Sequence, residues 1–496
     1  MAEKTSYGTI FKTTFLFGFV QVFKAVVSIL KNKIAAVLIG PEGMGILGIY
    51  QSVISMIQAG AGLGVNQSAV RDVSEANASG DTNIISKIIS VVNKVILYTG
   101  LLGCVVTLCL SYWLSDWTFE DNTHIISYCI LSLAIALNII DETKQAILKG
   151  MRQLRVLAKA GMIGSAAGLF ATAPLYYFFG KDGIVPALLI ASIVAVLVSS
   201  HYVEKIGYTK IDISFKETIL SGSPMIKMGM ALMAITFLQY LVALIVNVFI
   251  RSKGGLTDVG LYSAGNTIIN SYFGVIITAL MTDYYPRIAA VNNDNAAIQE
   301  ELNRQSLVTL VLTCPMFVLF MTLQSFFIQL LYTEGFLPAV EFMQWGIYFT
   351  LITIVSNQVD MILIAKYQSK IMLAISLAVR AFQVLLSIVL YSLMGLKGLG
   401  IAYLVLGVLH MVIMCSVVYH LYAIRFTQQF VKLALFVLGF ALCSSFVQAF
   451  MSGISYYVIT ALLLMMSLFF SLYVSKKQIG IDFLSMVKGK IIKNKK

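Results

Sequence analysis

Three lysines fall within the first long apolar segment of the chain, LFGFVQVFKAVVSILKNKIAAVLIGPEGMG, which runs from Leu16 to Gly45. Lys24 lies near its middle, and Lys31 and Lys33 follow. A lysine in the hydrocarbon of a bilayer costs about 2.5–3.5 kcal/mol on insertion scales, so such residues usually face a cavity and serve function. Because a lysine ammonium is a point-charge partner for phosphate groups, this pattern indicates binding of an anion. The structural alternative is that Lys24 pairs with an acid or a backbone carbonyl.

Polar side chains form a stripe on each of four apolar segments. The stripes are Gln21, Lys24, Ser28 and Lys31 in the first segment; Gln51, Ser55, Gln58 and Gly62 in the second; Thr353, Ser356, Asn357 and Asp360 in the tenth; and Ser376, Arg380, Gln383 and Ser387 in the eleventh. Each set falls on one face of an α-helix, which has 3.6 residues per turn. One stripe alone is typical of hydrogen bonding between membrane helices. Several stripes with charges of both signs indicate a shared water-filled cavity.

The predicted cavity is cationic, because Lys24, Lys31 and Arg380 outnumber Asp360. Such a cavity suits an anionic group, and a diphosphate is the candidate that lysine favours. Lys33 lies off the stripe near the outer helix end, where its stem can snorkel, so contact with a substrate requires a bend there. The predicted substrate-binding residues are Lys24, Lys31, Lys33, Gln51, Gln58 and Arg380.

Two aspartates are candidates for coupling to an ion or a proton. Asp360 lies in the tenth segment and Asp283 lies in the eighth. The structural alternative for each is a salt bridge, which is favoured for Asp283 because Arg287 follows it one helical turn later. Near the cytoplasmic end of the fourth segment, Asp141, Glu142 and Lys144 are predicted to form a solvated or paired cluster rather than a site.

Other motif-like patterns are rejected, and neither a metal nor a cofactor is predicted. GMGILG, from Gly43 to Gly48, matches the dinucleotide-binding glycine pattern but lies between membrane helices instead of following a strand. The four histidines have no metal-ligand spacing, and the six cysteines form no Cys-x-x-Cys pair. His410 lies within a membrane helix, where a structural hydrogen bond is expected. No nucleotide-binding loop is found, so an ion gradient or the membrane potential would supply the energy.

The composition predicts the elements that carry these residues. Of the 496 residues, 59% are hydrophobic and 12% are charged, whereas soluble domains carry about 25% charged residues. Because a membrane-spanning helix needs about 20 apolar residues, we predict an all-α polytopic membrane protein of about fourteen helices. Lysine and arginine gather in alternate connections, which predicts that both termini are cytoplasmic. This distribution also accounts for most of the net charge of +12 without nucleic acid as a partner.

Internal similarity predicts two related bundles. GILGIYQSVIS (Gly45–Ser55) aligns with GLYSAGNTIIN (Gly260–Asn270), although chance similarity between apolar segments is the alternative. Two six-helix bundles related by pseudo-symmetry are common in transporters. The predicted domains are an N-terminal six-helix bundle at 1–204, a cytoplasmic connector at 205–225, a C-terminal six-helix bundle at 226–423, an accessory helix pair at 424–475 and a basic cytoplasmic tail at 476–496.

The stretch VFKAVVSILKNKIAAVLIGPEGMGILGIYQSVISMIQAGAGLGV resembles the amino-terminal signature of Wzx-type flippases, which include O-antigen translocases and the enterobacterial common antigen (lipid III) flippase. These proteins belong to the multidrug/oligosaccharidyl-lipid/polysaccharide exporter superfamily. The family pattern has a lysine within the first helix, a second near its outer end and a Gly-Pro turn, and the matching residues are Lys24, Lys33, Gly40 and Pro41. DVGLYSAGNTIINSYFGVIITALMTDYYPRI and MILIAKYQSKIML resemble the family's eighth helix and its tenth-to-eleventh connection.

The resemblance implies transport rather than enzymatic activity. Such proteins move an undecaprenyl-diphosphate-linked oligosaccharide, the repeat unit of O-antigen or a related surface polysaccharide, from the inner to the outer leaflet of the bacterial cytoplasmic membrane. The implied mechanism is alternating access coupled to a proton or sodium gradient. The implied protein partners are a polysaccharide polymerase and a chain-length regulator. Lys24 would contact the diphosphate or an acidic sugar, with Lys33 as a second contact nearer the outside.

The alternatives fall into different classes, because a fold alone does not decide function. A lipid II flippase would share the fold, but the motifs fit the Wzx type better. A cation-coupled drug antiporter would also share the fold, but cationic drugs call for a cavity rich in carboxylates and aromatic side chains. A glycan polymerase or ligase needs a large external loop with catalytic groups, for which the short outer connections leave no room.

Overall fold

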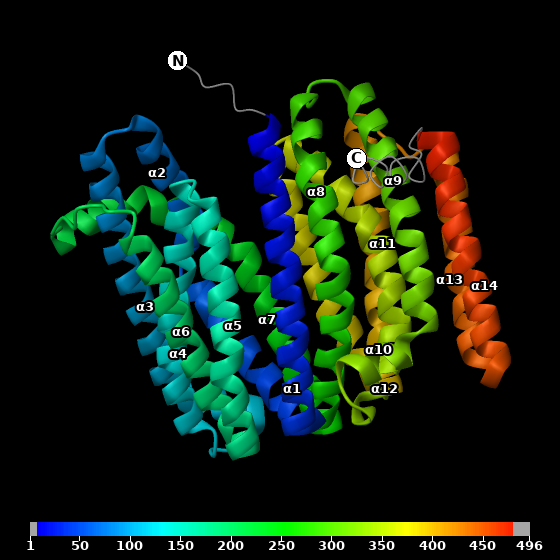
Figure 1. The fold of residues 1–496 in the computed structure, drawn as a ribbon, viewed down its shortest axis with the longest axis horizontal. Coiled ribbons are helices and arrows are strands. Elements are labelled where there is room, and N and C mark those ends of the chain that lie inside the picture. Colours follow the sequence, from blue (N-terminus) through cyan, green and yellow to red (C-terminus); the bar gives the residue numbers. More distant parts are fainter. Residues whose placement is uncertain (1–6, 480–496) are drawn as a thin grey trace, which may run out of the picture. The chain divides into compact units, whose positions relative to one another are not determined.

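The computed structural model describes residues 7–479, and every regular element among them is helical. Side chains are described for 23–477, except at 215, 219, 231, 232, 271–273, 275–280, 282 and 283. The helices, labelled in Figure 1, are α1 (Tyr7–Ala61), α2 (Val65–Ser79), α3 (Thr82–Phe119), α4 (Ile125–Gly150), α5 (Leu154–Phe179), α6 (Ile184–Glu204), α7 (Phe215–Thr267), α8 (Phe273–Ala290), α9 (Asn295–Thr322), α10 (Gln324–Leu331), α11 (Ala339–Ala365), α12 (Ser369–Tyr422), α13 (Gln428–Phe450) and α14 (Gly453–Val474). Short 3₁₀ or π turns lie at Gly180–Gly183, Ile268–Tyr272, Glu334–Phe336 and Ser475–Ile479.

Three of these elements each hold two helices that meet at a glycine. Non-helical backbone occurs at Gly40 (φ 66°, ψ −174°) in α1, at Gly255 (φ 76°, ψ −178°) in α7 and at Gly395 (φ 59°, ψ −141°) in α12. Backbone with such a positive φ is readily adopted by glycine and is costly for other residues. Divided at these kinks, the described residues form about fourteen long helices, which confirms the predicted all-α architecture. Nine helical segments there are long and apolar enough to cross a membrane, and some of them continue through a kink.

The chain forms two compact units. Unit 1 comprises the residues up to Ser263 together with Leu331–Gly335, and unit 2 comprises Ala264–Leu330 and the residues from Phe336 onward. The boundary lies inside α7, because 215–263 pack with the helices that precede them. The units therefore do not coincide with the predicted bundles, whose limits stay a prediction.

Helices α3, α4, α6 and α5 pack side by side within unit 1 (Figure 1). Helix α4 contacts α3 and α6, α6 contacts α5, and α5 contacts the first half of the chain's long α1 element. One apolar core of this unit includes Ile89, Ile147 and Val203, which come from α3, α4 and α6 and are fully buried. Close side-chain packing of this kind, rather than removal from water, holds helices together inside a membrane.

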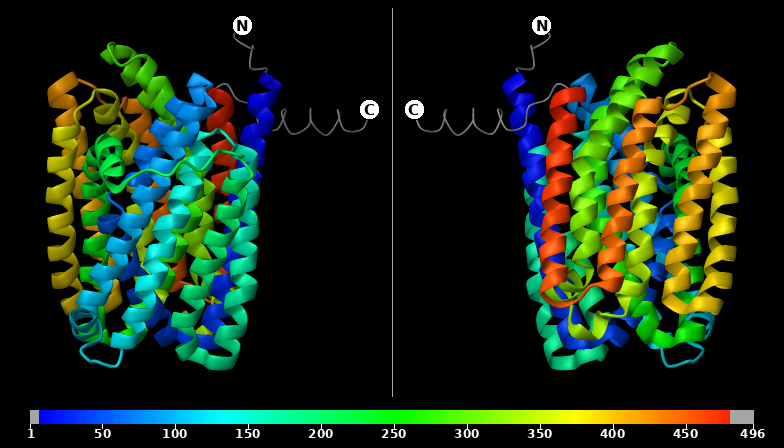
Figure 2. Two further views of the ribbon diagram at one scale, coloured as in Figure 1. Left: turned by 90° about the vertical axis from the view of Figure 1, so that its left-hand side faces the viewer. Right: turned by 90° about the vertical axis from the view of Figure 1, so that its right-hand side faces the viewer.

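The connector between α6 and α7 crosses the neighbouring helices (Figure 2), and its backbone bonds to α3 at two places. The backbone N–H of Thr209 donates to Ser86 Oγ, and that of Ile211 donates to Ser90 Oγ, both at 3.1 Å. Two residues of extended chain span about 6–7 Å, and so do four residues of an α-helix. Peptide groups two residues apart in the connector can therefore bond to serines four residues apart, on successive turns of α3. The serines of α3 hold the connector in place, and α7 begins at Phe215, inside the range 205–225 that the sequence predicts for the connector.

Helix α9 is the centre of unit 2, where it packs against α11, α13 and α14. Gln358 of α11 accepts a hydrogen bond from Ser306 and donates one to Thr309 Oγ1 at 2.8 Å, both on α9. Tyr348 of α11 has its hydroxyl 2.8 Å from Ser445 Oγ on α13. Because buried polar groups need such partners, these contacts specify which helix faces meet. The last two helices thus pack against α9 within this unit.

Candidate functional site

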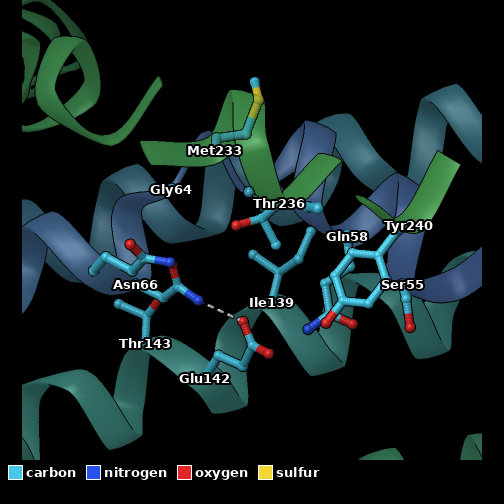
Figure 3. A pocket seen from close by; sticks show the side chains of 13 residues that line it. Ser55, Gln58, Gly64, Asn66, Ile139, Glu142, Thr143, Met233, Thr236 and Tyr240 are labelled. Carbon is cyan, nitrogen blue, oxygen red and sulfur yellow. Dashed lines mark hydrogen bonds between the residues drawn. The ribbon is translucent and has the colours of Figure 1, made fainter. Parts of the chain in front are cut away.

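A polar cavity of about 230 Å³ lies within unit 1, between the second half of α1 and helices α2, α4 and α7 (Figure 3). Most of its lining consists of side chains that donate or accept hydrogen bonds. These include Ser55, Gln58, Asn66, Glu142, Thr236 and Tyr240. Cavities of this kind, concave with a few placed polar groups, are where small ligands usually bind.

The cavity forms where a helix is interrupted. Helix α1 ends at Ala61 and α2 begins at Val65, and the backbone between them is left-handed at Leu63 (φ 50°) and Gly64 (φ 63°). Gly64 packs so closely on Gly229 of α7 that a Cβ on Gly64 would overlap the Gly229 carbonyl oxygen. At membrane depth, irregular backbone is tolerated where it is buried in protein or lines a water-filled cavity. The interruption therefore fits a hydrated site within the helices.

The amide of Asn66 holds the carboxylate of Glu142 in the cavity. Asn66 Nδ2 donates to Glu142 Oε2 at 2.7 Å, as Figure 3 shows, and Gln58 lines the same cavity. An adjoining cavity of about 550 Å³ shares these three residues and extends the lining to Asp141 and Lys149. Charges of both signs on α4 thus face the same hydrated region. The sequence predicts only a solvated or paired cluster for Asp141 and Glu142.

Lys24 lies half-buried against α5. Its side chain fills the space over Gly161, where a Cβ would overlap the lysine ammonium. The charge of Lys24 interacts with those of Asp141 and Lys149, which both line the adjoining cavity. In the part of the chain that the structure describes, Lys24 has neither a hydrogen bond nor an ion pair. An ammonium in this position is available to bind an anion.

The other predicted binding residues of unit 1 have different surroundings. Lys31 is half-buried and, among the described residues, makes no hydrogen bond or ion pair. Lys33 donates a hydrogen bond to the backbone carbonyl of Tyr332, in the segment before α11. Gln58 lines the cavity, whereas Gln51 is exposed and lies outside its lining. The binding roles of these residues stay predictions.

A second polar cluster lies in unit 2 and includes Asp360 and Arg380. His410 Nε2 lies 3.6 Å from Asp360 Oδ1, and His410 Nδ1 lies 3.2 Å from Ser356 Oγ. Arg380 donates to Gln383 Oε1 at 2.6 Å. The polar stripe of α11 therefore meets a histidine from the second half of α12, whereas Arg380 bonds to Gln383 of its own stripe. His410 has the hydrogen bond that the sequence predicts, and it also faces the predicted coupling carboxylate.

The structure does not test two of the predictions about charged residues. Lys24 and Lys31 belong to unit 1, whereas Arg380 and Asp360 belong to unit 2, so a cavity shared by all four stays a prediction. The side chain of Asp283 lies outside the described residues. Arg287, the expected partner of Asp283, forms an ion pair with Glu301 of α9.

Sequence reasoning did not select Asn66, Thr236 or Tyr240, which α2 and α7 bring to the cavity. One signal was present, because Thr236 and Tyr240 are spaced by one helical turn within an otherwise apolar segment. This spacing is a weaker indication of function than the buried lysines, because placing a neutral polar residue in a membrane helix costs less free energy than placing a charged one. Within the described residues, no group of three or more His, Cys, Asp or Glu side chains could hold a metal ion.

A family model described as "Polysaccharide biosynthesis protein" matches residues 34–341, which is more than half of the chain. The chain belongs to this polysaccharide biosynthesis protein family. The matched range contains every cavity residue of unit 1 described above, whereas Lys24, Lys31 and Lys33 precede it. A comparison with curated proteins finds no match for this polysaccharide biosynthesis protein.

Solved structures of transporters share its fold. A structure described as the lipid II flippase MurJ in an inward closed conformation is 14% identical, with a TM-score of 0.70, 95% of this chain covered and 100% of that chain covered. An inward-facing multidrug resistance MATE family transporter of the MOP superfamily is 15% identical, with a TM-score of 0.63 and coverages of 82% and 98%. A MOP superfamily transporter from Pyrococcus furiosus, described as having a binding pocket of reverse polarity, is 14% identical, with a TM-score of 0.55 and coverages of 81% and 94%. The polysaccharide biosynthesis protein is thus a multi-pass membrane protein with the fold of MOP superfamily transporters.

Proposed function

We propose that this polysaccharide biosynthesis protein is a Wzx-type flippase. It moves an undecaprenyl-diphosphate-linked oligosaccharide, the repeat unit of O-antigen or a related surface polysaccharide, from the inner to the outer leaflet of the bacterial cytoplasmic membrane. The observation that carries the proposal is the half-buried ammonium of Lys24, which interacts with charges lining the cavity of unit 1 and has no hydrogen bond among the described residues. The family supports a role in polysaccharide biosynthesis, and this cation supplies a partner for a lipid-linked diphosphate.

Each part of the substrate has a matching environment in this proposal. The diphosphate contacts Lys24, with Lys31, Lys33 and Arg380 as further cations along the path. The glycan occupies hydrated, hydrogen-bonding space, whereas the polyprenyl chain stays in the lipid, where its hydrocarbon loses no favourable contact. Alternating access between the two leaflets then requires the two halves of the fold to open on each side in turn, as in other transporters built from repeats.

A proton or sodium gradient drives the movement in this proposal, and Asp360 is the coupling carboxylate. Among the described residues, the ionisable side chain in contact with Asp360 is that of His410, with Nε2 at 3.6 Å from Oδ1. A histidine and a carboxylate so close together change their net charge when a proton binds, and such a change can bias one of two packing arrangements. Asp283 is the second candidate, from its sequence position alone.

Cation-coupled drug antiport is the second candidate function, because one feature of the cavity favours it. Glu142 and Tyr240 bring a carboxylate and an aromatic ring to the same space, which is the lining that a cationic drug requires. Lysines beside the same region oppose this function, since Lys24 and Lys149 would repel a cation. A lipid II flippase is the other alternative and would need the same diphosphate contacts.

The proposal is tested by reconstituting the full chain in proteoliposomes that contain a polyprenyl-diphosphate-linked oligosaccharide. Movement between leaflets is measured as the fraction of glycan that a membrane-impermeant glycosidase can reach, with and without proton or sodium gradients. We expect the wild type to move the lipid and Lys24→Ala to move it about 10- to 100-fold more slowly, because a charge-assisted contact worth about 1.5–3 kcal/mol is lost.

The matched control is Lys210→Ala, which removes an exposed lysine paired with Glu204 at 3.5 Å in the connector. It should move the lipid at the wild-type rate. If Lys24→Ala folds and transports normally, Lys24 is structural and the diphosphate contact must lie at Lys33 or Arg380. No movement of several such lipids by the wild type, together with gradient-driven uptake of a cationic dye, would establish the antiport alternative instead.

A further inference from the structure

We propose that the cavity around Glu142 is a subsite for one sugar residue of the transported glycan, and that it selects a sugar without a carboxylate over a uronic acid. This inference rests on the proposed flippase function and adds the sugar preference. In this proposal the diphosphate and the sugar bind to different groups. Lysines bind the diphosphate, whereas neutral and acidic groups bind the sugar.

The hydrogen-bonding groups of the cavity match the hydroxyls of a sugar. Each sugar hydroxyl both donates and accepts, so a sugar site needs donors and acceptors on several sides. Gln58 and Asn66 supply amides, Ser55 and Thr236 supply hydroxyls, and they come from α1, α2 and α7. They surround the space rather than lining one edge of it, as Figure 3 shows.

Glu142 is the strongest acceptor in this set. An ionised carboxylate has about four lone-pair sites, and the amide of Asn66 uses one of them. The remaining sites can accept hydrogen bonds from two adjacent hydroxyls of one sugar ring. Hydrogen bonds to a charged acceptor are stronger and shorter than neutral ones, so this residue would orient the ring.

The apolar part of the cavity fits the other property of a sugar, the C–H face of its ring. Tyr240, Ile139 and Met233 line the cavity together with the polar groups. In Figure 3 the Tyr240 ring stands beside Ser55 and Gln58, so a sugar could rest on the ring while its hydroxyls reach the amides. The volume of about 230 Å³ equals roughly eight water molecules at about 30 Å³ each, which is the scale of one sugar ring rather than a chain.

The charge of the cavity decides which sugar fits. Glu142 is the only charged residue in the described lining of the smaller cavity. A uronic acid would place its carboxylate beside that of Glu142, and like charges brought together at a binding site oppose binding. A neutral hexose or an amino sugar meets no such repulsion. The diphosphate is excluded from this cavity for the same reason, which leaves it to Lys24 and the other cations.

The test uses two polyprenyl-diphosphate disaccharides that differ only at C6 of one sugar, a hexose in one and the corresponding hexuronic acid in the other. Both are assayed in proteoliposomes with the glycosidase-accessibility method. We expect the wild type to move the hexose lipid about tenfold faster, as like-charge repulsion at a binding site predicts, and Glu142→Gln to reduce this ratio below about threefold by speeding the hexuronic acid lipid. Thr236→Val should slow both lipids because it removes a hydroxyl and adds no charge.

The matched control is Glu217→Gln, which neutralises a carboxylate that pairs with Lys87 at 3.4 Å outside the cavity and should keep the wild-type ratio. If Glu142→Gln unfolds, Asn66→Asp tests the same charge effect, since a second carboxylate should widen the ratio. A ratio near one in the wild type, or one unchanged in a folded Glu142→Gln variant, would overturn the sugar subsite while leaving the flippase function intact. If Glu142→Gln changes only the dependence of transport on a proton gradient, equally for both lipids, Glu142 serves proton coupling and the sugar subsite is overturned. Failure of the wild type to move either lipid would instead refute the flippase function.

Discussion

Gly45 and Gly260 lie face to face within unit 1. A Cβ on Gly45 would come within 3.2 Å of the backbone nitrogen of Gly260, and a Cβ on Gly260 within 3.0 Å of that of Gly45. Gly45 also packs against the carbonyl of Leu256, and Gly260 packs against the carbonyl of Pro41. Leu256 and Pro41 each directly follow a kink glycine, so each glycine of the pair contacts the equivalent residue of the other helix. Such reciprocity is what an internal two-fold relationship produces, and the weak sequence match between the halves begins at these two glycines.

The glycine contact predicts a stability effect. We expect Gly260→Ala to lower the free energy of unfolding by about 1–3 kcal/mol, because an added methyl in a closed contact forces the two helices apart. The measurement is denaturant unfolding of the purified protein in mixed micelles. Gly164→Ala in α5 is the control, since a Cβ there meets no atom within 4 Å and should change stability by about 1 kcal/mol or less. Equal losses in both variants would mean that the close approach does not contribute.

Lys33 is predicted to stabilise the protein whatever its part in transport. Its ammonium donates to the carbonyl of Tyr332, in a segment that belongs to unit 1 although the flanking helices belong to unit 2. We expect Lys33→Met to lower the free energy of unfolding by about 1.5–3 kcal/mol, the range for a hydrogen bond from a charged group. Lys181→Met is the control, because Lys181 is an exposed lysine paired with Glu42. A stable Lys33→Met variant with slowed transport would instead support the predicted substrate contact.

Asp360 and His410 predict how transport responds to an ion gradient. We expect Asp360→Asn to bind the lipid substrate but to lose the acceleration that a proton or sodium gradient gives the wild type, because asparagine carries no charge to exchange. His410→Gln should retain a hydrogen bond to Ser356 and lose only a proton-driven acceleration. Proteoliposome transport with imposed gradients measures both effects, and Asp182→Asn, on an exposed residue, serves as the control. A gradient response that survives in Asp360→Asn would move the coupling site elsewhere.

The connector is predicted to loosen in acid. Asp212 lies in the connector, 2.7 Å from Lys94 Nζ, and the hydrogen bond and charge of Lys94 hold the pKa of Asp212 below its ordinary value. A carboxylate of this kind stabilises the folded state fully above its ordinary pKa of about 3.9, and the contribution is lost as the pH falls through the lower folded-state value. We expect the amides of Thr209 and Ile211 to exchange faster below about pH 4, after correction for the intrinsic rate.

Hydrogen exchange of Asp212→Asn provides the comparison for the connector. The variant should exchange these amides faster than the wild type at neutral pH, and its corrected rates should not rise further in acid. If the acid effect persists in the variant, another group is responsible. The serines of α3 that accept from the connector would then be the main anchors.

The helical architecture could be predicted from the sequence because its signals are local. A run of apolar residues long enough to span a bilayer is visible in a single segment, and so are a lysine within it and a glycine that ends it. Gly40 does adopt a positive φ, and the start of the internal repeat at Gly45 corresponds to a real contact. The same locality explains why Lys24 stood out, since one buried charge is costly whatever lies beside it.

The sequence alone determined which face of each helix is polar, but only the tertiary structure decided which polar faces meet. Helical periodicity places Gln58 and Asp360 on their stripes, and it says nothing about Glu142 or His410, which reach them from other segments of the chain. The interruption at Gly64 depends on the close approach of Gly229, a long-range contact that no local pattern encodes. Partners far apart in sequence are chosen by packing and by the need to satisfy buried polar groups, and those conditions exist only once the helices have come together.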